Sequence, residues 1–228
     1  MTDPLDNAVW HALTGPQHDV AQRNASAARY EPDVAPFAAL PDEPSAAAWD
    51  DLRALVGPGN GAVLFRAEVD APDGWEVLWR GIGFQMVATT PPPGAARDGA
   101  GVTPLGHADV DDMTDLVART RPGPFLPRTI TLGTYLGVRL DGKLVAMAGE
   151  RMRLDGFTEV SAVCVHEAYR GRGYAARLVG ELVARVCARR ETAFLHVVGD
   201  NAPAIALYEK LGFVVRRTIE AAGVRAPG

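Results

Sequence analysis

The junction at residues 160–176 constrains the fold of this chain more than any other feature. Residues 160–165 read Val-Ser-Ala-Val-Cys-Val, and such a largely apolar run is typical of a strand covered on both faces of a sheet. A turn with Gly171 and Gly173 follows, and residues 174–187 then carry apolar side chains at i+4 spacing, as the buried face of a helix requires. The junction predicts a central strand that leads through a glycine-rich turn directly into a helix.

This junction has the properties of a binding site for an anion. Glycine lets the backbone approach a ligand without a Cβ in the way. The first N–H groups of a helix have no intrahelical partner, and the helix dipole adds about half a positive charge there. Arg170 and Arg172 supply guanidinium groups suited to phosphate. The alternative is an ordinary strand-to-helix turn with solvated arginines, because a short glycine motif is weak evidence by itself.

Hydrophobic periodicity predicts an alternating series of strands and helices after residue 101. Asp141 and Gly142 separate two of the strands and predict a two-residue hairpin turn. Asn201 and Gly212 are the expected cap and stop of the last helix. In chain order, the expected elements are a strand at 102–105, a helix at 109–120, strands at 134–140, 143–151 and 157–165, a helix at 171–189, a strand at 194–198, a helix at 201–211 and a strand at 213–219.

The proline- and glycine-rich stretch 89–101 opposes regular structure and predicts a boundary. We therefore divide the chain into an N-terminal region, residues 1–100, and a second domain, residues 101–228. The first forty residues show little periodicity, so the sequence predicts no element there. In the rest of the N-terminal region we expect a short helix at 49–56 and strands at 62–67 and 75–82.

Composition excludes several classes of protein. Of the 228 residues, 47% are hydrophobic and 22% charged, which is typical of a globular chain and not of a disordered one. The formal net charge of -5 provides no basic field, so we expect neither a nucleic acid nor a membrane surface as partner. The chain opens without the pattern of a signal peptide and has no run of about 18 apolar residues, which favours a cytoplasmic protein.

The cysteines and histidines do not form reactive or metal-binding patterns. Cys164 and Cys187 lie in apolar stretches and make no CxxC pair, which favours a reducing compartment and core packing for both. The histidines show no metal-ligand spacing, so we expect no metal.

Two motifs in the right order resemble the signatures of the GNAT superfamily of acyl-CoA-dependent N-acyltransferases. Residues 170–175, Arg-Gly-Arg-Gly-Tyr-Ala, match the pattern Gln/Arg-x-x-Gly-x-Gly/Ala, and residues 208–213, Tyr-Glu-Lys-Leu-Gly-Phe, follow Asn201 as in the second signature. The resemblance covers about residues 102–219. It implies an α+β fold with a central splayed mixed β-sheet flanked by helices, here preceded by an N-terminal α/β region. Residues 1–100 are then either a degenerate transferase-like lobe or a substrate-shaping lobe.

The resemblance also implies a place for coenzyme A. The pantetheine arm would lie between two splayed strands, hydrogen-bonded to the backbone of Val163, Cys164 and Val165. Asn201 would either contact the pantetheine or only cap its helix. The pyrophosphate would bind the backbone N–H groups of Arg170, Gly171, Arg172, Gly173, Tyr174, Ala175 and Ala176.

The implied reaction is direct attack of a neutral amine on the thioester of acetyl-CoA, with both substrates bound. By resemblance, Tyr208 is the acid that protonates the departing thiolate, although packing alone would also explain this tyrosine. Our choice of base is Glu159, which strand alternation places on the face of Ser161, Val163 and Val165. Burial is expected to raise the pKa of Glu159 toward neutrality.

Two further residues are candidates for the base. His196 lies on the neighbouring splayed strand and titrates near neutrality, but such a histidine is often a hydrogen-bonded core residue. Glu150 is a weaker candidate. Phe125, in the loop at 121–128, either covers the acceptor or anchors that loop to the core.

The sequence thus predicts an acetyl-CoA-dependent N-acetyltransferase that acts on a primary amine of a small molecule or a protein. Two alternatives remain open: a non-catalytic acyl-CoA-binding regulatory module, and a transferase with another acyl donor.

Overall fold

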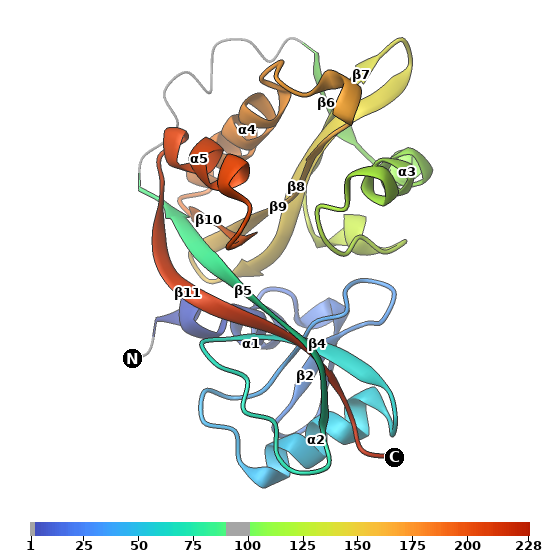
Figure 1. The fold of residues 1–228 in the computed structure, drawn as a ribbon, viewed down its shortest axis with the longest axis vertical. Helices are drawn as coiled ribbons and strands as arrows, with labels where there is room; N and C mark the ends of the chain where they lie inside the picture. Colours follow the sequence, from blue (N-terminus) through green and yellow to red (C-terminus); the bar gives the residue numbers. More distant parts are fainter. Residues whose placement is uncertain (1–2, 90–100) are drawn as a thin grey trace.

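The computed structural model describes residues 3–89 and 101–228, and its main feature is an eight-stranded sheet in the order β4-β11-β5-β10-β9-β8-β7-β6. The long strands β5 and β11 run side by side through both halves of the molecule (Figure 1). The strands of this sheet are β4 (Gly61–Arg66), β5 (Glu76–Ala88), β6 (Val102–Leu105), β7 (Tyr135–Leu140), β8 (Lys143–Leu154), β9 (Phe157–Val165), β10 (Thr192–Val198) and β11 (Phe213–Arg225). The α-helices are α1 (Ala8–Thr14), α2 (Ala46–Val56), α3 (Val110–Thr120), α4 (Tyr174–Ala188) and α5 (Ala202–Lys210). A small separate sheet contains β1 (Ala21–Arg23), β2 (Ala28–Tyr30) and β3 (Ala38–Ala39).

Helices cover both faces of the main sheet. Neighbouring residues of a strand point to opposite faces, and in β8 Ala146 packs in the cluster that contains α4, whereas Met147 packs in the cluster that contains α3. Within the sheet, β9 and β10 are parallel, and the other neighbouring pairs are antiparallel. The predicted α+β fold, with a mixed sheet flanked by helices, is confirmed.

Most elements predicted after residue 101 are present with ends that differ by a few residues. Strand β9 has the predicted bounds, and Asp141 and Gly142 form the hairpin turn with φ angles of 50° and 77°. Helix α4 begins at Tyr174 and not at residue 171, because Gly171 and Gly173 have φ angles of 76° and 78°, outside the helical region.

Strands β5 and β11 extend furthest beyond their predicted ends. Strand β5 continues to Ala88 and β11 to Arg225, because these strands pair with each other from Phe213 to Arg225. The sequence pattern near residue 82 contains no signal for this extension, which depends on a partner more than a hundred residues away.

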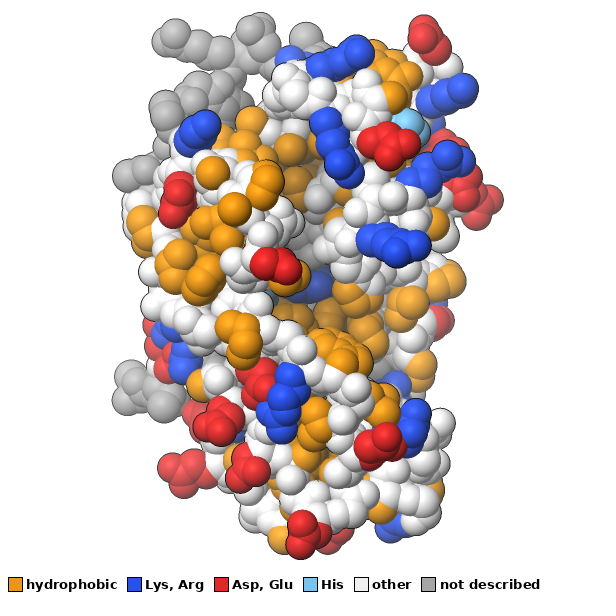
Figure 2. Space-filling view, viewed as in Figure 1, with side chains coloured by type: hydrophobic (Ala, Val, Ile, Leu, Met, Phe, Trp, Pro, Cys, Tyr) orange, Lys and Arg blue, Asp and Glu red, His pale blue; other side chains and the backbone are white. Residues whose placement is uncertain are grey.

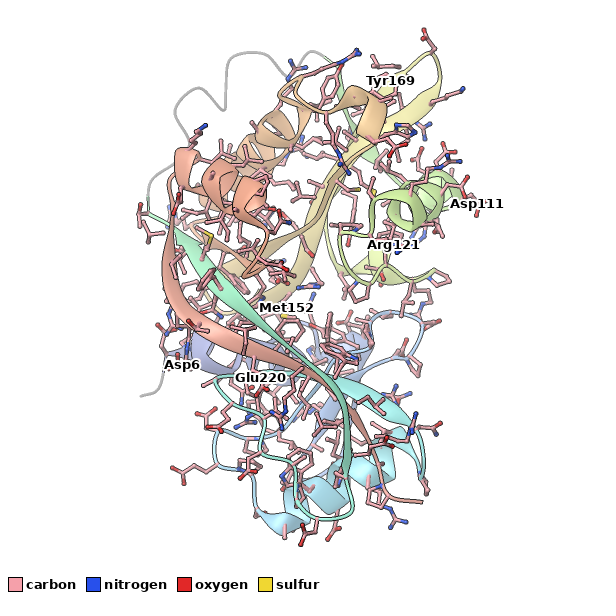
Figure 3. The ribbon with its side chains drawn as sticks, viewed as in Figure 1. Asp6, Asp111, Arg121, Met152, Tyr169 and Glu220 are labelled. Atoms are coloured by element: carbon pink, nitrogen blue, oxygen red, sulfur yellow. The ribbon has the colours of Figure 1, made fainter. Side chains whose placement is uncertain are left out.

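The N-terminal region contributes strands to the sheet of the second domain. Strand β5 lies between β11 and β10, and β4 pairs with β11 at the edge. Helix α1 packs in a cluster with Met152 and Leu154 at the end of β8 and Phe194 of β10, and Figure 3 shows Met152 close to this N-terminal segment. The division at residue 100 stays a prediction, since one sheet contains strands from both sides of it. Most of the boundary stretch, residues 90–100, lies outside the described residues.

Strands β9 and β10 diverge soon after they pair. They are hydrogen-bonded neighbours only where residues 192–194 face residues 157–159. Beyond this point β10 continues against β5, with His196 opposite Gln85, while β9 continues against β8. The predicted splay is thereby confirmed, and the gap that it opens holds the candidate site.

Candidate functional site

A cavity of about 320 Å³ lies where β9 and β10 diverge. Figure 2 shows a hollow near the middle of this face, with hydrophobic side chains around it. One part of its wall comes from β9, β10 and α5; it includes Val163, Asn201 and Tyr208. The other part comes from β4, β5, β8 and β11 and from the loop at 122–124; we call this part the acceptor part. The side chains that line the acceptor part include Phe65, Trp79, Pro122, Pro124, Arg151 and Ile219.

A β-bulge in β9 forms one side of the cavity. Met147 of β8 pairs with Cys164, but Gly149 pairs with Ser161, so two residues of β9 face one of β8. Ala162, in this bulge, has a φ angle of 52°, which is uncommon for a residue with a Cβ. A bulge bends its strand, and this one lies where β9 has left β10.

The bulge corrects the prediction about Glu159. Val160 packs in the same cluster as Val163 and Val165, whereas Cys164 packs in the cluster on the other face. The odd spacing from Val160 to Val163 means that the alternation changes at the bulge. Glu159, next to Val160, therefore does not share a face with Val163 and Val165, and simple alternation was wrong there.

Glu159 is fully buried, and Arg151 binds it through two hydrogen bonds. Nε and Nη2 of Arg151 donate to the two carboxylate oxygens at 2.7 and 2.6 Å, a bidentate arrangement. Nδ1 of His196 lies 2.7 Å from the same oxygen that Nη2 contacts. Burial alone raises the pKa of this carboxyl, but Arg151 and the hydrogen bond from His196 hold the pKa of Glu159 at about 2. The expected rise in the pKa of Glu159 is therefore wrong.

The contacts of Gln85 assign the proton of His196. The Oε1 atom of Gln85 accepts from Arg216 at 2.9 Å, so the amide nitrogen of Gln85 faces the other way. This nitrogen donates to the carbonyl of Leu5 at 2.8 Å and lies 3.2 Å from Nε2 of His196. In this assignment His196 is neutral, carries its proton on Nδ1 toward Glu159 and offers a lone pair on Nε2.

Tyr208 lines the cavity from α5 and packs its ring edge-on against Phe213. Burial raises the pKa of Tyr208 to about 12, so this phenol keeps its proton at neutral pH. Asn201 also lines the cavity, and its side chain accepts a hydrogen bond from the N–H of Ala204 at 3.3 Å as the N-cap of α5. The structure brings Val163, Asn201 and Tyr208 to the lining of one cavity, and their roles toward coenzyme A stay predictions.

The glycine-rich turn lies at the beginning of α4, in the region that Figure 3 labels at Tyr169. Helix α4 has no side-chain cap on its first N–H groups, and Arg172 lies over the Tyr169 ring at 5.2 Å. A Cβ at Gly171 or Gly173 would meet no atom within 4 Å, so the positive φ angles, and not lack of space, require glycine there. Open space before uncapped N–H groups fits a phosphate group.

Other predicted residues lie outside the cavity wall. Cys164 is buried as a free thiol in the core near α3, and burial raises its pKa to about 11. Glu150 is buried in an ion pair with Arg189 at 2.9 Å and accepts from the N–H of Thr134. Phe125 packs its ring against Tyr135 in the core, as an anchor of its loop would.

Sequence reasoning missed Arg151, Gln85 and the apolar residues of the acceptor part. A charged residue at position 151, inside the otherwise buried strand β8, was a signal of a buried ion pair that periodicity alone does not report. Phe65 and Trp79 carried no such signal, because ordinary apolar strands contain residues of this kind.

Comparisons with known proteins agree with this fold. A family model described as FR47-like protein matches residues 135–221. A crystal structure from Novosphingobium aromaticivorans, described as an acetyltransferase of the GNAT family, is 40% identical with a TM-score of 0.90 and full coverage of both chains. A GCN5-related N-acetyltransferase from Kribbella flavida shares the fold, with 20% identity, a TM-score of 0.63 and coverage of 96% of this chain and 94% of that one.

Two curated relatives match part of the chain. N-alpha-acetyltransferase RimI of Mycobacterium tuberculosis is 43% identical over 82 residues, which are 35% of this chain and 51% of RimI. An uncharacterized Mycobacterium leprae protein is 44% identical over 84 residues, 35% of this chain and 22% of that protein. The chain thus spans about half the length of one curated relative and less of the other. By its full-length match to the Novosphingobium structure, this chain belongs to the GNAT family of acetyltransferases.

Two features are absent from residues 3–89 and 101–228. No helix in these ranges is long and apolar enough to cross a membrane. No group of three or more His, Cys, Asp or Glu residues there is arranged to hold a metal ion.

The ion pair of Glu159 predicts how stability depends on pH. Because the pKa of Glu159 is lowered to about 2 by folding, its contribution is complete above the unfolded pKa of 4.5 and is lost as the pH falls toward 2. Glu159→Gln leaves the buried Arg151 without a charged partner and is expected to cost about 3–5 kcal/mol at pH 7. The measurement is the free energy of urea unfolding from pH 7 to pH 3.

The matched control is Glu209→Gln, at an exposed position of α5. Below pH 5 the wild type and this control are expected to lose stability more steeply than Glu159→Gln. Equal slopes in the wild type and in Glu159→Gln would contradict the proposed linkage.

Proposed function

We propose that this protein transfers an acetyl group from acetyl-CoA to a primary amine of a small molecule or a protein. The observation that carries the proposal is that one cavity is lined by the β9 bulge, Tyr208 and His196. A hydrogen-bonding backbone edge, an acid and a base are what thioester aminolysis requires. Family membership supports the same reaction.

Acetyl-CoA supplies, when bound, the thioester whose carbonyl carbon the amine attacks. The residues that would hold it are those of the glycine-rich turn, Arg170–Ala176, and the backbone of Val163, Cys164 and Val165. Three observations support this seat: the uncapped beginning of α4, the divergence of β9 from β10, and the small open residues Gly171 and Gly173. Asn201 lines the same wall and contributes a polar side chain to it.

His196 is our choice of proton acceptor for the amine. An ammonium with a pKa near 10.4 is neutral in only about one part in a thousand at pH 7, so a base must take its proton. Nε2 of His196 carries the lone pair, and protonation there requires Gln85 to give up its 3.2 Å contact. Glu159 then faces an imidazolium through Nδ1 at 2.7 Å and stabilises it. Glu159 as the direct base stays a prediction, and its low pKa argues against it.

Tyr208 is our choice of acid for the departing thiolate. A thiol has a pKa near 8.5, so the departing thiolate is basic enough to accept a proton. A positioned acid donates this proton more effectively than water does. The phenol of Tyr208 retains its proton because burial raises its pKa to about 12. It lines the wall on the α5 side, across from the acceptor part.

Residues 1–100 are proposed as the substrate-shaping part of the protein. Phe65 and Trp79 line the acceptor part of the cavity and come from this region. The strands that carry them belong to the same sheet as β10. This position supports the substrate-shaping interpretation over a separate transferase-like lobe.

Release of free thiol from acetyl-CoA tests the proposed function. Purified protein with acetyl-CoA and a panel of primary amines is expected to release thiol in an amine-dependent way. Propionyl-CoA and longer donors in parallel reactions examine the donor preference. Thermal stabilisation by coenzyme A without amine-dependent release would contradict the enzyme and favour the regulatory module.

Removal of the Tyr208 hydroxyl is expected to lower kcat without loss of coenzyme A binding. Tyr208→Phe keeps the ring that packs on Phe213 but loses the proton donor, so kcat falls about 10²-fold. The control is Tyr135→Phe, because the buried Tyr135 hydroxyl has no hydrogen-bond partner in the described part of the chain and does not line the cavity. Equal rates in the two variants would show that Tyr208 only packs.

Replacement of His196 is expected to remove the base. His196→Gln retains hydrogen-bonding groups of similar size, and kcat is expected to fall about 10²–10³-fold because the proton acceptor is lost. The readout is kcat for this variant and for Glu159→Gln, with folding of both followed by circular dichroism. A loss confined to folded Glu159→Gln, with kcat of His196→Gln close to that of the wild type, would return the base role to Glu159.

A further inference from the structure

We propose that the acceptor is an α-amino acid with an apolar side chain of aromatic size, whose carboxylate binds Arg151. The inference rests on the proposed acetyl transfer and names the class of amine that the acceptor part of the cavity fits. The inference depends on three features: the wall is apolar, its described residues include no Asp or Glu, and the guanidinium of Arg151 has one nitrogen available to a ligand.

The acceptor part has an apolar wall that is open to a ligand. Phe65, Trp79 and Ile219 come from three neighbouring strands and line it together. The strand register places their side chains on one face of the sheet. Trp79 is 48% exposed, although it is a large apolar side chain. A ligand with an apolar group would cover it and gain the free energy of burying that surface. The wall thus favours an acceptor with an apolar body.

The charges of the wall argue against an acceptor with several amino groups. Among the described residues that line the cavity there is no Asp and no Glu. The carboxylate of Glu159 lies behind the cavity wall, where it is fully buried and already bound by Arg151 and His196. A polyamine or a lysine-rich segment would have to leave its second ammonium in an apolar cavity without an anion, which is costly.

Arg151 retains one nitrogen for a ligand. Nε and Nη2 bind Glu159, but Nη1 makes no hydrogen bond with any residue in the described ranges. Nη1 is also not among the side-chain nitrogens and oxygens that are sealed from solvent without a partner. Since Arg151 is 8% exposed and lines the cavity, this nitrogen is reached from the cavity. A guanidinium N–H pairs best with an anionic oxygen.

The anion that suits this nitrogen is a carboxylate. Glu159 already balances the charge of Arg151, and both side chains are buried. A phosphate dianion would therefore add two negative charges that this pair does not balance, whereas a carboxylate adds only one. The face of Phe37 lies 4.7 Å from the guanidinium carbon and holds the plane of Arg151, so the direction of Nη1 is set before a ligand binds.

The positions of Arg151 and His196 fit an amine and a carboxylate on one carbon. Nη2 of Arg151 and Nδ1 of His196 contact the same Glu159 oxygen at 2.6 and 2.7 Å, so the guanidinium and the imidazole lie side by side. An α-amino acid presents its carboxylate and its amine side by side as well. When the carboxylate of the amino acid binds Nη1, its amine lies on the side of His196, the proposed base. The side chain of the amino acid then contacts the apolar wall.

The test compares wild-type kcat/KM for three amines with the same ring: L-phenylalanine, L-phenylalaninamide and phenethylamine. L-Phenylalanine is expected to exceed the other two by about 10–100-fold, the range of a hydrogen bond to a charged group. A poor rate with L-alanine is expected from the loss of the apolar contact. This comparison needs no variant, so it stays valid if changes at Arg151 disturb folding.

Variants test the two contacts separately. Arg151→Lys, with folding checked by thermal unfolding, is expected to reduce the preference for L-phenylalanine over phenethylamine to less than threefold. Trp79→Ala is expected to lower kcat/KM for L-phenylalanine about tenfold. Its matched control is Leu78→Ala, since Leu78 is 43% exposed on the same strand but does not line the cavity.

The outcomes separate this inference from the proposed function. Thiol release with phenethylamine or with a peptide amine at rates equal to or above that with L-phenylalanine would overturn the inference and leave acetyl transfer in place. Efficient acetylation of spermidine would overturn it in the same way. No release with any amine, in a protein that binds coenzyme A, would overturn the proposed function itself.

Discussion

The candidate site depends on the short parallel pairing of β9 and β10. The strands share a ladder over residues 157–159 and 192–194 and then take different partners, β8 and β5. A continuous ladder would satisfy the backbone of both strands and leave no gap. The early end of the ladder leaves polar backbone of β9 facing a cavity, and unpaired backbone groups need a hydrogen-bond partner. In a member of the GNAT family, the amides of a ligand arm are suited to that role.

The second constraint is a buried charge pair. Removing Arg151 and Glu159 from water is expensive, and only their bidentate hydrogen bonds and mutual attraction compensate for it. The pair also orients His196, whose second nitrogen Gln85 contacts in turn. Gln85 is held by Arg216, which forms an ion pair with Asp6 at 2.7 Å, so the N-terminal segment is linked to the site through successive polar contacts.

The long strands β5 and β11 explain why the N-terminal region belongs to the site. Both strands extend from the region around α5 into the lower half of the molecule in Figure 1. Strand β4 pairs with β11, and this pairing places Phe65 beside His196, with ring centroids 5.2 Å apart. Residues more than a hundred positions apart in the chain therefore share one acceptor wall.

Much of the fold and the glycine-rich turn followed from local sequence patterns. Periodicity predicted β9 to the residue, and Asp141-Gly142 predicted the hairpin between β7 and β8. Gly171 and Gly173 stood out because glycine lets a ligand approach the backbone, and the structure adds that both have positive φ angles. Asn201 and Tyr208 belong to a second local motif. These features depend on neighbours in the chain, and one sequence contains that information.

The tertiary structure alone decided the chemistry of Glu159 and the shape of the acceptor part. Burial by itself would raise the pKa of Glu159, but Arg151 from the neighbouring strand lowers it to about 2. Which partner a buried carboxylate meets depends on strand register, and a second irregularity sets two residues of β8, Arg151 and Met152, opposite Glu159. The walls from Phe65 and Trp79 likewise depend on long-range strand pairing, for which a local pattern holds no signal.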